Sequence, residues 1–108
     1  MSTTLQKSIE ALLSNAFGDT NSSITCRNVL LSACDPARYK ADVGDLLYLD
    51  STKKHAALEV ISYRVLEQDS IERMIELKTA QRLRDTWCSD QERLSATDGA
   101  LPQTPGYF

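Results

Sequence analysis

Residues 43–79 constrain the fold more than any other part of this chain. They begin with Val-Gly-Asp-Leu-Leu-Tyr-Leu-Asp and continue with two runs rich in branched and aromatic residues, separated by the polar residues 67–70. Such side chains fit a pleated sheet better than a helix. The sequence therefore predicts a buried strand at residues 46–49, followed by a hairpin with strands at residues 58–66 and 71–79.

The segment at residues 23–34 is ambiguous between a strand and a helix. Its apolar residues alternate only imperfectly, as a half-buried strand would require. A helix that uses Cys26, Val29, Leu30 and Ala33 fits about as well. We predict a strand here, ended by Asp35-Pro36 because proline has no N–H to donate to a ladder.

A similar ambiguity affects residues 71–78. Alternation places Ile71 and Ile75 on one side and charged residues on the other, which favours a strand. The competing helix would start at Asp69, with Glu72 three residues later as a capping partner. We predict the strand and keep the helix as the alternative.

The two ends of the chain are predicted to differ from its middle. Residues 3–17 form an amphipathic helix, because Leu5, Ile9, Leu12 and Ala16 recur at helical spacing. A short C-terminal helix is expected from residue 80. The predicted fold class is thus α+β: the N-terminal helix, a small antiparallel β-barrel or sandwich, the short helix, and an extended tail. An all-α bundle is the alternative. Residues 1–94 make one domain and residues 95–108 a flexible or partner-docked tail.

Composition excludes several classes of protein. The formal net charge is −3, with no basic excess in either half, so nucleic acid stays open as a partner but is not favoured. No apolar run is long enough to span a membrane, and no secretion signal is evident. The three cysteines have no metal-binding spacing and are expected to be reduced and mostly buried.

The residues needed for catalysis do not converge in the sequence. The single histidine, His55, follows two lysines and has no orienting partner nearby. Asp42, Asp45 and Asp50 lack the spacing of a calcium loop and are better explained as turn residues and caps. We therefore predict no enzyme activity, no catalytic residues, no metal and no cofactor.

Two sets of residues are candidates for an interface. Arg38, Lys40, Lys53 and Lys54 form small basic loops that flank the predicted strand at residues 46–49. Tyr107 and Phe108 end a proline-containing segment, where two aromatic rings suit an anchor in a neighbour's pocket. Solvated loops and a frayed end remain the alternatives.

The N-terminal amphipathic helix, the Gly44-Asp45-Leu46-Leu47-Tyr48-Leu49 segment and the hairpin together resemble the head-tail joining proteins of tailed bacteriophages. The resemblance covers about residues 5–79 and is one of architecture. It implies a non-enzymatic structural protein of the phage virion, assembled in the bacterial cytoplasm. Copies would form a homo-oligomeric ring in the head-tail connector or tail and contact other virion proteins. The alternative function is a small phage or mobile-element inhibitor that binds a host protein, as anti-CRISPR proteins do.

Overall fold

The described part of the chain folds entirely into helices. The computed structural model describes residues 3–99, and the surroundings of the side chains for residues 4–92. Its elements are α1 (Thr3–Leu13), α2 (Asn21–Cys34), α3 (Val43–Leu46), α4 (Ser51–Leu66), the 3₁₀ turn η1 (Glu72–Met74) and α5 (Leu77–Gly99). No described residue lies in a strand, so the predicted α+β fold and its β-barrel or sandwich are wrong. The all-helical alternative is correct.

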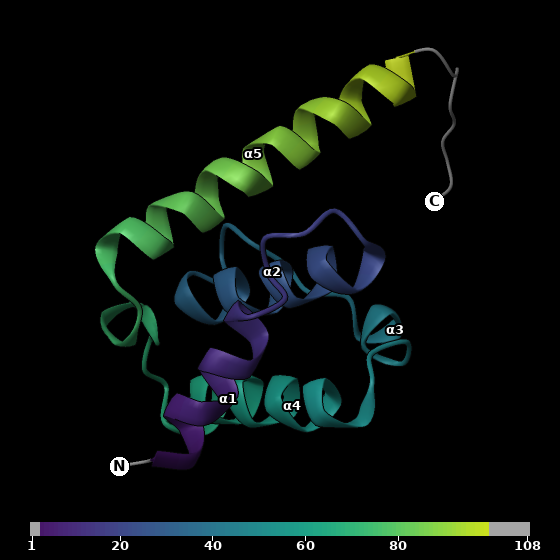
Figure 1. The fold of residues 1–108 in the computed structure, drawn as a ribbon. Coiled ribbons are helices and arrows are strands. Elements are labelled where there is room, and N and C mark those ends of the chain that lie inside the picture. Colours follow the sequence, from purple (N-terminus) through teal and green to yellow (C-terminus); the bar gives the residue numbers. More distant parts are fainter. Residues whose placement is uncertain (1–2, 100–108) are drawn as a thin grey trace.

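The helices stack in three levels (Figure 1). α4 and α5 lie on opposite sides of α2, and α1 crosses in front, against both α4 and α2. The short α3 stands at the end where the chain passes from α2 to α4. This arrangement leaves one long side of α4 facing away from the rest of the molecule.

The N-terminal amphipathic helix is confirmed. α1 ends at Leu13 and a turn follows. Leu5, Ile9, Leu12 and Ala16 are all buried, as their spacing predicted. The stripe was readable because its large apolar residues alternate with polar ones such as Lys7 and Glu10.

The predicted strand at residues 46–49 is the end of α3 and the turn after it, and the one at residues 58–66 lies within α4. Leu46 and Leu49 are buried at 8% and 5% exposure, whereas Leu47 and Tyr48 are 67% and 86% exposed, which is the spacing of a helical turn. The Asp50 side chain accepts a hydrogen bond from the Lys53 N–H and caps α4. Strand preference is worth only about 1 kcal/mol over its whole scale, so capping and packing outweigh it here.

Residues 23–34 also form a helix rather than the predicted strand. α2 begins after Thr20, whose hydroxyl accepts from the Ser23 N–H, and ends at Asp35, just before Pro36. The face formed by Cys26, Val29, Leu30 and Ala33 is fully buried. α2 is the central helix, and it is enclosed by α1, α4 and α5.

The second predicted hairpin strand is replaced by η1 and the start of α5. Ile71 and Ile75 are buried, but Leu77 is exposed. α5 is not the predicted short helix, since it begins at Leu77 and continues to Gly99, beyond the point where the tail was expected to start. Residues 100–108 lie outside the described part of the chain. The barrel on which the phage resemblance was based is therefore absent from residues 3–99.

A buried ion pair fastens α5 to α2. Arg27 is completely buried and donates from Nε and Nη2 to Asp90 Oδ2 at 2.9 and 2.5 Å. Its Nη1 donates to the carbonyl oxygens of Ala16 and Gly18 at 2.5 and 3.1 Å. The guanidinium thus joins α2, α5 and the connection between α1 and α2.

Candidate interaction surface

Exposed apolar side chains gather on α3, the turn after it, and α4. Among the described residues, seven large hydrophobic side chains are exposed, and Leu77 is the one outside this region. We call the other six the α3–α4 apolar face: Val43, Leu47, Tyr48, Leu58, Val65 and Leu66. Val43 and Val65 line one groove, and Leu58 and Leu66 line another depression. Exposed apolar patches on a protein surface are typical of interaction sites.

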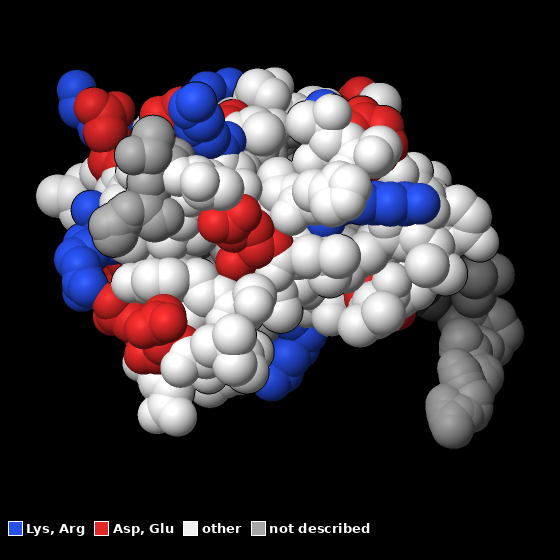
Figure 2. Space-filling model, turned by 90° about the horizontal axis from the view of Figure 1, so that it is seen from below, with Lys and Arg blue, Asp and Glu red and all other residues white. Residues whose placement is uncertain are grey.

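Figure 2 looks directly onto the α4 side of the molecule. Many of the charged side chains lie toward the edges of this view, but an acidic one also lies near its middle, among uncharged residues. The side is therefore mixed in charge, and its apolar part consists of the six exposed side chains named above.

A groove opens beside this face, between the end of α2, the loop at residues 35–42 and α4. It has a volume of about 330 Å³, which suits one or two side chains rather than a large cofactor. Most of its lining is apolar, and its charged residues are both basic. The lining residues are Ser32, Ala33, Pro36, Tyr39, Lys40, Ala41, Val43, Ile61, Arg64 and Val65.

The two cations of the groove differ in their surroundings. Lys40 donates from Nζ to the Pro36 carbonyl oxygen at 2.7 Å. Arg64 has a buried Nε without a hydrogen-bond acceptor, the one such side-chain atom within the described residues. No carboxylate lines the groove. Both the apolar walls and the positive charge are therefore available to a ligand of complementary character.

The predicted basic residues lie on two separate segments. Arg38 and Lys40 belong to the loop between α2 and α3, and Lys53 and Lys54 belong to the first turn of α4. Arg38 stands over the Tyr39 ring at 5.7 Å, and Lys53 pairs with its own helix cap, Asp50, at 3.4 Å. Of the four, only Lys40 lines the groove.

The sequence did not point to Arg64. It pointed to Lys40, but not to the groove that this side chain lines. Only the packing of the loop at residues 35–42 against α4 brings these two cations together, and no local pattern signals it. Tyr107 and Phe108, the predicted aromatic anchor, lie outside the described residues.

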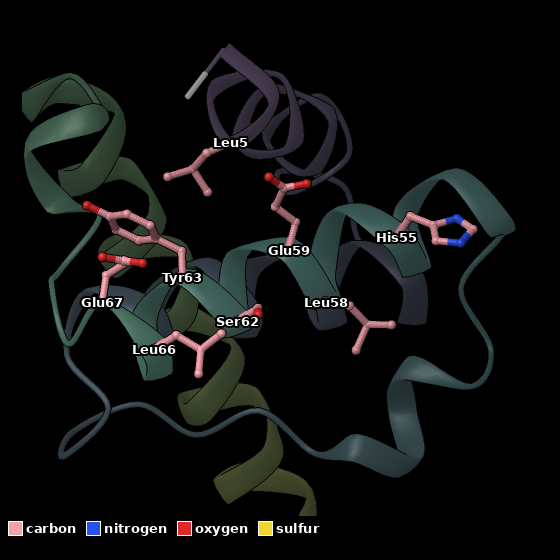
Figure 3. Close-up of a pocket in the computed structure, with 8 residues that line it drawn as sticks. All are labelled: Leu5, His55, Leu58, Glu59, Ser62, Tyr63, Leu66 and Glu67. Carbon is pink, nitrogen blue, oxygen red and sulfur yellow. The ribbon is translucent and has the colours of Figure 1, made fainter. Parts of the chain in front are cut away.

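A second depression runs along α4, and the single histidine is one of its lining residues (Figure 3). His55 lies at one end of it and Glu67 at the other, about 18 Å apart along the helix. Glu59 is the nearer carboxylate, one helical turn along, and it lines a further pocket with His55 beside α1. Glu59 points toward α1 in Figure 3, and within the described residues no hydrogen bond joins it to His55. The His55 Nδ1 lies 3.0 Å from the Ser51 carbonyl oxygen, within its own helix. This geometry forms no acid–base pair in the depression.

Tyr63, which lines the same depression, is held by the loop before α5. Its hydroxyl donates to Asp69 at 2.8 Å, and Arg73 also contacts that carboxylate. The hydrogen bond to Asp69 raises the pKa of Tyr63 and lowers the pKa of Asp69. A tyrosine with a raised pKa is a poor base at neutral pH, so the pair is better suited to holding the end of α4 than to catalysis.

Two of the three thiols are unsuited to nucleophilic chemistry. Burial raises the pKa of Cys26, and burial with the nearby Glu72 raises the pKa of Cys34 to about 11. The thiolate, which is the reactive form, is therefore scarce at both positions at neutral pH. Cys88 is exposed on α5.

We expect a single fast-reacting thiol in the folded protein. At about pH 8, a disulfide reagent such as Ellman's should modify Cys88 rapidly, and Cys26 and Cys34 only as slowly as the protein opens. In denaturant all three should react at once. Cys88→Ser is the control and should remove the fast phase, and a fast phase that survived it would contradict this assignment.

The acidic residues flanking α3 act as caps, as predicted from the sequence. The carboxylate of Asp42 accepts from the Gly44 N–H at 2.8 Å, and that of Asp50 from the Lys53 N–H at 2.9 Å. Within the described residues no group of three or more His, Cys, Asp or Glu side chains is placed to hold a metal ion. None of the described helices is long and apolar enough to cross a membrane.

Comparison with known proteins gives one match. A family model described as "Family of unknown function (DUF7673)" matches residues 6–88. No curated protein and no solved structure matches the chain. The matched range includes the whole α3–α4 apolar face and every residue of the groove.

Proposed function

The chain belongs to the DUF7673 family, whose function is unknown, and we propose that it is a non-enzymatic assembly protein whose copies associate through the α3–α4 apolar face. The observation that carries the proposal is the concentration of exposed large hydrophobic side chains on that face. The proposal keeps the protein–protein role expected from the sequence, including a homo-oligomer.

Physical chemistry favours covering this face. Burying one leucine or valine side chain fully is worth about 1.5–3 kcal/mol relative to leaving it in water. A stable interface needs about 800 Å² from each partner. The stripe of Leu58, Ile61 and Val65 recurs at the spacing that lets two helices pack.

A phage connector ring and a host-binding inhibitor make different demands on self-association. Assembly into a phage connector ring is one form of self-association, but its architectural basis, the barrel, is not available to support it. The inhibitor alternative requires a monomer or dimer bound tightly to a host protein. The number of copies in solution distinguishes a ring from an inhibitor that is a monomer or a dimer.

We expect the full chain to sediment as a dimer or larger species. Leu58→Glu should shift it to a monomer, because a carboxylate placed at the centre of an apolar interface must be buried unpaired. The expected loss of affinity is at least about tenfold, which corresponds to about 1.4 kcal/mol. Analytical ultracentrifugation over a range of concentrations measures both.

Leu77→Glu is the matched control. Leu77 is exposed at the start of α5, outside the α3–α4 apolar face, so the same substitution should leave association unchanged. A wild-type protein that stayed monomeric at every concentration, or equal effects of the two substitutions, would exclude self-association through this face.

A further inference from the structure

We propose that the groove between α2, the loop at residues 35–42 and α4 binds an acidic amphipathic helix of a partner protein. In this arrangement a carboxylate of the partner pairs with Arg64, and an apolar side chain next to it enters between Ile61 and Val65. The groove shares Val43 and Val65 with the α3–α4 apolar face, but the inference does not require the copies to self-associate.

The charges that line the groove favour an acidic partner. Arg64 and Lys40 both line the groove, and no carboxylate there balances them. The Nε of Arg64 is buried without an acceptor and is closed to solvent, so a carboxylate of the partner would pair with the outer nitrogens of the guanidinium. A guanidinium binds a carboxylate through two parallel hydrogen bonds more strongly than it binds a neutral oxygen. An acidic side chain supplies what the groove lacks.

The walls of the groove favour a partner segment that is apolar as well as acidic. Apart from the two cations and Ser32, the lining is apolar or aromatic, so the carboxylate must be carried by a segment that also offers apolar side chains. Exposed Val43 and Val65 continue the lining outward, which leaves room for a chain to run past the groove. The spacing of Leu58, Ile61 and Val65 presents ridges into which the ridges of a second helix fit.

Nucleic acid fits these walls poorly. Single strands are bound by stacking bases on open aromatic faces. The aromatic residue here, Tyr39, is only 5% exposed, and its ring meets Trp87 edge-on at 4.9 Å between centroids. It is therefore committed to the core rather than available to a base.

The test uses two blocked helical peptides that differ at one position. Each carries a stripe of leucines, and the central residue beside the stripe is glutamate in one peptide and glutamine in the other. Binding is measured by NMR chemical-shift mapping on the full chain. We expect the glutamate peptide to bind at least about tenfold more tightly, as one charge-assisted hydrogen-bonded pair provides. The largest shifts should fall on Ala33, Ile61 and Arg64.

Arg64→Gln should make the two peptides bind equally, whereas Arg73→Gln, an exposed arginine outside the groove, should leave the preference intact. The same two peptides are also titrated into Leu58→Glu, which alters the α3–α4 apolar face but no residue of the groove. A glutamate preference in this variant shows that peptide binding does not depend on self-association. Equal binding of the two peptides to the wild type, a preference that survives Arg64→Gln, or no binding to either the wild type or Leu58→Glu would overturn it.

Discussion

Asp90→Ala is expected to lower the free energy of unfolding by about 3–5 kcal/mol, the largest single effect predicted for this protein. Arg27 and Asp90 have side chains that are 1% and 6% exposed, and the Asp90 carboxylate accepts two of the guanidinium's hydrogen bonds. Removing it leaves a buried positive charge with only the carbonyl oxygens of Ala16 and Gly18 as acceptors. Urea denaturation followed by circular dichroism measures the loss.

Two further variants show whether the effect comes from the unpaired charge. Asp85→Ala removes an exposed carboxylate from the same helix, one that accepts from Gln81, and should change stability by less than about 0.5 kcal/mol. The double variant Arg27→Met with Asp90→Leu should recover part of the stability, because it removes the unpaired buried charge, although the carbonyl oxygens of Ala16 and Gly18 lose their donor. A loss below about 1 kcal/mol for Asp90→Ala would show that the pair is not sealed from water.

The effect of Asp90→Ala should also be local. α5 contacts the body through Ala80, Leu83, Trp87 and Asp90, which recur at helical spacing along one side. Asp90 is the last of these, so its loss should release the distal part of α5 first. Hydrogen exchange of the α5 amides should accelerate beyond Trp87 before the rest of the molecule opens.

The N-terminal helix was predictable because one physical signal dominated it. Leucine and isoleucine mark one side of α1 and charged residues mark the other, so the 3.6-residue period appears directly in the sequence. The caps at Asp42 and Asp50 were predictable for a similar reason, since an aspartate before a helical turn satisfies free backbone N–H groups.

Residues 58–66 of α4 were mistaken for a strand because this part of the helix carries apolar side chains on both its buried and its exposed side. Its inner side consists of the small residues Ala56 and Ala57 with Val60, whereas larger side chains such as Leu58 and Leu66 are exposed. This distribution hides the helical period and leaves branched and aromatic residues as the strongest local signal. The exposed apolar side chains that made the strand prediction wrong therefore belong to the face on which the proposed function depends.

α2 was ambiguous for a different reason. It is the central helix and is buried on several sides, with Ser23, Thr25 and Arg27 enclosed along with the apolar residues. A charged residue in the middle of a buried helix breaks the expected stripe, and only the partner carboxylate on α5, distant in the sequence, explains its presence. The groove was hidden in the same way, because Lys40 and Arg64 meet only in the folded chain.

Leu12→Ala is expected to lower the free energy of unfolding by about 2–5 kcal/mol. Leu12 is completely buried on α1, which packs against both α4 and α2. The buried residues of α4, against which α1 packs, are Ala56, Ala57 and Val60, and their short side chains cannot extend far into the space that Leu12 would leave. The cavity would therefore persist, and its cost adds to the lost burial. Urea denaturation at low protein concentration measures the effect without a contribution from association.

Leu58→Ala provides the matched comparison, since it deletes the same atoms from a leucine that is 58% exposed on the outer side of α4. Its unfolding free energy should change by less than about 0.5 kcal/mol at low concentration. Ultracentrifugation should give the opposite order of effects. Leu12→Ala keeps the α3–α4 apolar face and should still associate, whereas Leu58→Ala should associate more weakly. If both lost stability and association together, the face and the core would be one cooperative unit, and the outer side of α4 would not be a separate binding surface.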